Sequence, residues 1–152
     1  MVMKKMVICS LFIGIFGISY GQDYTRQADS LKNEGLLMPA LKKHYAGLAQ
    51  NSSTKIHYEI ASIYALLWTD QARDSAFVHL NIAVKNDSTL KVLYNPSFLS
   101  LIEDQRWEKI EDSQLNKYET ANEPIRNRTF ARELFRMIIK DQGFMYAGNI
   151  ER

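Results

Sequence analysis

Cysteine, glycine and proline are all scarce in this chain of 152 residues, which has one, seven and three of them. A lone cysteine cannot build a disulfide framework or a metal site made of several thiolates. Few glycines and prolines favour long, uninterrupted helices or strands. An excess of one charge is missing too, because 19 lysines and arginines face 17 acidic residues. The near balance gives no general attraction to nucleic acid, so no nucleic-acid partner is expected.

Long apolar runs are also missing, except for one from Met6 to Ile18 that follows two lysines. At about 13 residues, this run is shorter than the roughly 20 that a membrane-spanning helix needs. Ser19 and Gly21 then place small residues at the −3 and −1 positions of a cleavage site. We therefore expect residues 1–21 to be a cleaved signal peptide and the protein to be exported, periplasmic or secreted. An uncleaved anchor is the weaker alternative, and no stable membrane insertion is expected after cleavage.

Apolar residues recur at helical spacing through the rest of the chain, which predicts an all-α fold. Asp74 predicts the start of one helix, and Asn95 followed by Pro96 predicts an N-cap with proline at the first helical position. The only strand-like stretch, Leu90 to Tyr94, lies in a connection. The clearest apolar stripes are Ile56, Ile60, Ile63, Tyr64 and Leu67; Ala76, Phe77, Leu80, Ala83 and Val84; and Phe130, Leu134, Met137 and Ile138.

A spacing pattern occurs twice, with the second copy beginning 33 residues after the first. The first copy is Ala28, Leu31, Gly35, Ala40, His44 and Gly47, and the second is Ala61, Tyr64, Trp68, Ala76, Leu80 and Ala83. This pattern resembles the tetratricopeptide repeat (TPR), in which small and large residues alternate so that two antiparallel helices pack closely. The resemblance implies helix pairs that bind a protein or peptide. Two positions depart from it, since His44 stands where a large apolar residue is usual and Trp68 replaces the turn glycine.

Two repeats are one fewer than a repeat array normally needs to bury a continuous core, so further helices should cap the second copy. The stretch from Asn95 to Ile110 resembles the segment that follows the last TPR pair in exported proteins of the Bacteroidota type. The organisation expected after the signal peptide is therefore TPR-like helix pairs over 22–94 and a capping segment over 95–120. A C-terminal helix over 121–142 and a tail over 143–152 would follow.

Catalytic and metal-binding patterns are not found in the sequence. The histidines His44, His57 and His79 do not have the i, i+3 or i+4 spacing that places two ligands on one helical face. No nucleophile elbow and no glycine-rich phosphate loop are present. Adjacent carboxylates such as Glu111 and Asp112 point about 100° apart on a helix. We therefore assign no catalytic, cofactor-binding or metal-binding residue and expect no cofactor.

Two groups of residues are candidates for partner binding. The first helix of each repeat should line a groove, where Tyr58, Glu59 and Ser62 are expected to be exposed. The second group is a basic stripe on the C-terminal helix, Arg128, Arg132 and Arg136, continued by Lys140. Like charges four residues apart oppose helix formation, so an opposite charge should offset them. We expect the acidic residues of 103–112 to do so, while an acidic external partner stays an alternative.

The preferred interpretation is an exported TPR-like domain that binds a protein or peptide without catalysis. One alternative is a structural module of the cell envelope that assembles with itself into a homo-oligomer. The least favoured alternative is part of an envelope enzyme. Trp68 and Trp107 are interpreted as packing residues rather than as ligand-stacking ones. Leu80 should be buried between the repeat helices, because it takes the large-residue position between two alanines.

Overall fold

The computed structural model describes the backbone of residues 24–150 and the side chains of residues 24–144. The predicted signal peptide, 1–21, lies outside the described residues. The described part is all-helical and contains no strand, which confirms the predicted fold class. A first helix over 24–33 precedes α2 (Leu37–Gln50), α3 (Thr54–Leu66) and α4 (Asp70–Ala83). Two 3-10 helices, η1 (Lys91–Tyr94) and η2 (Pro96–Leu101), lead to α5 (Gln105–Ala121) and α6 (Arg128–Ile150).

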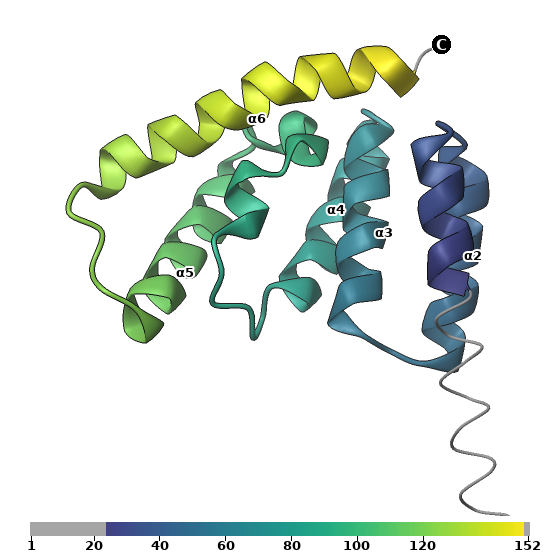
Figure 1. Ribbon diagram of the computed structural model, residues 1–152, viewed down its shortest axis with the longest axis horizontal. Coiled ribbons are helices and arrows are strands. Elements are labelled where there is room, and N and C mark those ends of the chain that lie inside the picture. The colour runs from purple at the N-terminus through teal and green to yellow at the C-terminus, as the bar shows by residue number, and fades with distance from the viewer. Residues whose placement is uncertain (1–23, 151–152) are drawn as a thin grey trace, which may run out of the picture.

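The helices α2 to α5 stand beside one another, and α6 lies across one end of the group (Figure 1). The pair α3 and α4 shares the most extensive contact between helices, and α2 packs against α3 on the other side. The last helix, α6, rests mainly on η1 and η2. Within the predicted capping segment, η2 packs on α3, and α6 in turn packs on η2.

Polar side chains fix where the helices begin. The hydroxyl oxygens of Ser53 and Thr69 accept hydrogen bonds from backbone N–H groups in the first turns of α3 and α4. Thr69 therefore starts α4 at Asp70, four residues before the predicted start at Asp74. Asn95 caps η2 as predicted, with Pro96 as the first residue, although the helix is of the 3-10 type. The strand-like stretch Leu90–Tyr94 is likewise mostly 3-10 helix.

Two apolar clusters form the core. One lies between the first helices and α3, and includes Leu41, Ile60 and Ile63. The other extends from α3 and α4 through η1, η2 and α5 to Ile139 of α6. Leu80 is completely buried in this second cluster, as predicted. Trp107 is buried there as well, which agrees with its interpretation as a packing residue.

Positions matched by the two sequence copies have similar environments in the structure. Gly35 and Trp68 both have positive φ angles, 77° and 54°. His44 and Leu80 are both buried. The left-handed conformation costs glycine nothing but is unusual for a bulky residue. Trp68 adopts it while remaining exposed, so its interpretation as a packing residue is wrong.

The C-terminal helix does not stop at residue 142, as the sequence pattern predicted, but continues to Ile150. Gly143 lies inside it, where α6 crosses η2. A Cβ atom at this position would come within 2.9 Å of Leu99. Gly143 therefore permits close approach of two elements, rather than marking a helix end.

Candidate functional site

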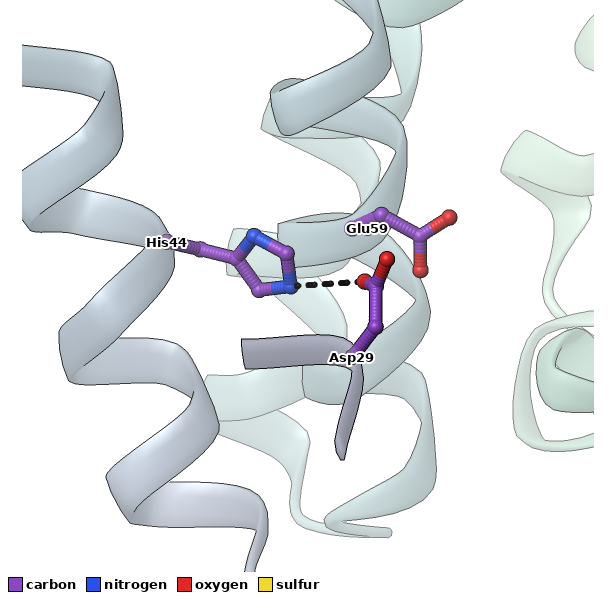
Figure 2. Close-up of side chains that lie close together, drawn as sticks. All are labelled: Asp29, His44 and Glu59. Carbon is purple, nitrogen blue, oxygen red and sulfur yellow. Dashed lines mark ion pairs between the residues drawn. The ribbon is translucent and has the colours of Figure 1, made fainter. Parts of the chain in front are cut away.

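His44 of α2 is the most unusual buried side chain in the described part of the chain. It is 1% exposed, and neither ring nitrogen has a hydrogen-bond partner among the residues that the structure describes. Its imidazole points toward the carboxylates of Asp29, from the first helix, and Glu59, from α3 (Figure 2). His44 Nε2 lies 3.7 Å from Asp29 Oδ1. One ligand-capable atom from each of the three side chains lies within 4.8 Å of the others.

A lysine and a serine complete the surroundings of this cluster. Lys32 Nζ lies 3.0 Å from Glu59 Oε2 and donates a hydrogen bond to Ser62 Oγ at 2.7 Å. Burial lowers the pKa of His44, which favours the neutral imidazole. Burial also raises the pKa of Asp29, and the charge of Glu59 raises it further. The arrangement offers a neutral nitrogen ligand and two carboxylates, which is a donor set that divalent metal ions accept.

A second polar cluster joins α2, α3 and α4. His57 Nδ1 and His79 Nδ1 are 2.9 Å apart, so one imidazole donates a hydrogen bond to the other. His79 Nε2 is also 3.0 Å from the Tyr45 hydroxyl, which lies 3.2 Å from the Tyr64 hydroxyl. Burial lowers the pKa of His79, and the neighbouring His57 adds to the effect. All four side chains therefore have hydrogen-bond partners within the fold.

The predicted groove residues are not the exposed surface that the repeat pattern suggested. Ser62 is completely buried, which contradicts its expected exposure, because its hydroxyl bonds within α3 and to Lys32. Glu59 is partly buried and paired with the same lysine. Tyr58 is partly buried and accepts a hydrogen bond from the Asn95 side chain at 2.7 Å. All three side chains therefore have internal partners.

The basic stripe is held within the chain, as predicted. Arg136 donates two hydrogen bonds of 2.7 Å to the buried carboxylate of Glu111. Lys140 pairs with Glu103 at 2.8 Å. Arg132 pairs with Asp112. Arg128 differs from the prediction, since its partner Glu119 lies beyond the 103–112 region.

These ion pairs turn the predicted apolar stripe of α6 away from the core. Phe130, Leu134 and Met137 are 60%, 42% and 65% exposed, whereas Ile139 is buried. The arginine-bearing side of the helix faces the acidic residues, so the opposite side faces solvent. Farther along, the exposed Phe144 lines a hollow of about 400 Å³. The other lining residues of this hollow are Trp68, Leu99, Ile102, Glu103 and Lys140.

The sequence analysis predicted neither the cluster of Asp29, His44 and Glu59 nor the exposed apolar side of α6, although the sequence contains signals for both. The signal for the cluster is His44 itself, at a repeat position where an apolar side chain is usual. The signal for the α6 surface is a helix with two competing faces, one apolar and one basic. Neither signal says which residues from distant parts of the chain meet there.

Among the residues that the structure describes, no helix combines the length and apolar character needed to cross a membrane. Comparison of the chain with protein-family models, curated proteins and solved structures finds no match.

Proposed function

We propose that the protein is a TPR-like binding module that takes up an amphipathic helix of a partner protein on the outer face of α6. The observation that carries this proposal is the exposed stripe formed by Phe130, Leu134, Met137 and Phe144, which we name the α6 apolar face. At about 100° per residue, its members fall within an arc of about 80°, opposite Ile139. Export to the periplasm or beyond, predicted from residues 1–21, is the setting proposed for this binding.

The spacing of the α6 apolar face favours a helical partner. Its members are separated by four, three and seven residues, which is the spacing of a coiled-coil seam. Asp141 takes the intervening seam position, so one polar residue interrupts the stripe. Contiguous exposed apolar patches rimmed by polar residues are typical of protein–protein interaction sites.

The hollow beside Phe144 supports the same proposal. Trp68 and Phe144 are both exposed at its wall, while Leu99 and Ile102 supply an apolar lining. Aromatic side chains beside a pocket are typical of interface residues with large energetic effects. Trp68 also keeps an unfavourable positive φ angle, and such strain often occurs at functional positions. A partner side chain inserted here would anchor one end of the bound helix.

Photo-crosslinking in cells tests the proposal. A crosslinking amino acid at position 134 should give an adduct with one other protein, while the same group at the exposed Val78 of α4 should not. With the captured protein purified, replacing Leu134 and Met137 by serine should weaken its binding at least tenfold, as expected from the loss of two interface anchors. Trp68→Gly should also weaken binding and leave the helical content unchanged.

The matched control replaces Val78 and Ile82, an exposed apolar pair on α4, by serine. This variant should bind the captured protein as tightly as the wild type. An adduct with the mass of two copies, together with concentration-dependent sedimentation, would support self-assembly instead. Equal binding by the Leu134/Met137 variant would show that the α6 apolar face is not the binding surface.

A further inference from the structure

Asp29, His44 and Glu59 form a cluster, here called the His44 cluster, that shares no residue with the α6 apolar face. Its buried imidazole has no hydrogen-bond partner among the described residues. A buried imidazole needs a hydrogen-bond partner, because burial removes the water that would otherwise bond its nitrogens. Neither Nδ1 nor Nε2 has such a partner among the described residues. The matching position of the second repeat copy is Leu80, so the fold itself does not require a polar side chain here.

The distances around Nε2 suit two ligands of one metal ion better than a hydrogen bond. Asp29 Oδ1 is 3.7 Å from His44 Nε2, which is longer than a good hydrogen bond. Two metal–ligand bonds of about 2.1 Å meeting near the tetrahedral angle separate their ligand atoms by about 3.4 Å. A ligand atom of Glu59 completes the group within 4.8 Å. Small side-chain rotations would therefore bring all three onto one ion.

The cluster is accessible to an ion from solvent. The Asp29 side chain is 44% exposed, which gives an ion a path from solvent. Lys32 competes with the ion, because its ammonium already lies 3.0 Å from Glu59 Oε2. Binding would displace the Lys32 ammonium from the carboxylate.

We propose that Asp29, His44 and Glu59 bind one divalent transition-metal ion, with Zn²⁺ the ion that best fits the donors. One imidazole and two carboxylates give three protein ligands, which leaves a fourth position for water. This replaces the expectation of no metal ligand, which considered only spacing along the sequence. The three ligands come from three different helices, so the ion would join the first helix, α2 and α3.

Calorimetric titration of the chelator-treated protein with ZnCl₂ tests the proposal. One ion should bind per chain and raise the melting temperature. His44→Leu should weaken Zn²⁺ binding at least 100-fold, and Asp29→Asn or Glu59→Gln should weaken it at least tenfold. Lys32→Met should tighten binding several-fold, because it removes the competing ammonium. A purely structural role for Lys32 would not produce this gain.

The control replaces both His57 and His79 by glutamine, which removes the other two histidines and leaves the proposed ligands in place. This variant should bind Zn²⁺ as the wild type does. His44→Leu should keep its helical content, since leucine occupies the matching position 80, so loss of binding would not reflect unfolding. No measurable binding by the wild type would overturn the proposal. Unchanged binding by His44→Leu would also overturn it, and loss only in the His57/His79 variant would assign the metal to that pair.

Discussion

At the residue scale, His44 and Leu80 occupy matching repeat positions and make opposite contributions to the core. Leu80 fills its position with apolar atoms and is completely buried. His44 is almost as buried but carries two nitrogens without a hydrogen-bond partner among the described residues. Leaving a buried polar group unsatisfied costs about 1–3 kcal/mol.

His44→Leu is therefore expected to increase the free energy of unfolding by about 1–2 kcal/mol when metal is excluded by a chelator. Urea denaturation measures the change. The reference variant, Leu80→Ala, should decrease the free energy of unfolding by about 2–5 kcal/mol, because it opens a cavity in the same kind of site. A loss of stability in His44→Leu would mean that the imidazole has favourable contacts that leucine cannot replace.

At the scale of the element, α6 is held by ion pairs of unequal burial. Arg132 and Arg136 have equally exposed side chains, at 32%. Their partners differ, since the Glu111 side chain is 1% exposed and that of Asp112 is 54% exposed. The Trp107 indole also donates a hydrogen bond of 3.1 Å to Glu111. The Arg136–Glu111 pair is therefore the main polar attachment between α6 and α5.

Arg136→Ala should decrease the free energy of unfolding by about 3 kcal/mol, because it leaves a buried carboxylate without its charge partner. Arg132→Ala, the matched control, should cost less than about 1 kcal/mol, as exposed pairs do. Chemical denaturation of the two variants gives the comparison, and added salt should reduce only the Arg132 effect appreciably. Equal losses would show that burial of the carboxylate does not govern the attachment of α6.

At the scale of the whole molecule, Arg106 connects α4 with the start of α5. Its guanidinium donates hydrogen bonds to both carboxylate oxygens of Asp104, at 2.9 and 2.7 Å, and to Asp74 of α4 at 2.7 Å. It also lies over the Phe77 ring, 4.2 Å from the centroid. The Arg106 hydrogen bonds lower the pKa of Asp104 to about 2. Asp104 further serves as the N-cap of α5.

This lowered pKa predicts a pH-dependent contribution to stability. In the unfolded chain Asp104 titrates near 3.8, so its ionised form stabilises the fold above about pH 4, and this contribution decreases as the pH falls toward 2. Asp104→Asn keeps an N-cap side chain but removes the charge. It should cost about 1 kcal/mol at pH 6 and less at pH 3, as measured by urea denaturation. An equal cost at both pH values would show that the charge of Asp104 does not contribute to stability.

The sequence by itself determined the helical class and much of the core. Periodicity is a local property, and it predicted the burial of Leu80 and the helical character of α3 to α6 without knowledge of the packing. The charge pattern also predicted that Arg132 and Arg136 would find acidic partners within 103–112. The predicted start of α4 at Asp74 is wrong, because Thr69 is also an acceptable N-cap and the packed structure uses it.

Only the tertiary structure decided which face of α6 is buried and which polar residues meet. The apolar and basic sides of this helix are both plausible contact faces, and the position of Glu111 on α5 selects the basic one. His57 and His79 are 22 residues apart and still touch. Asp29, His44 and Glu59 likewise converge from three helices. Spacing along one helix fixes neighbours on that helix alone, whereas contacts between helices depend on how they pack.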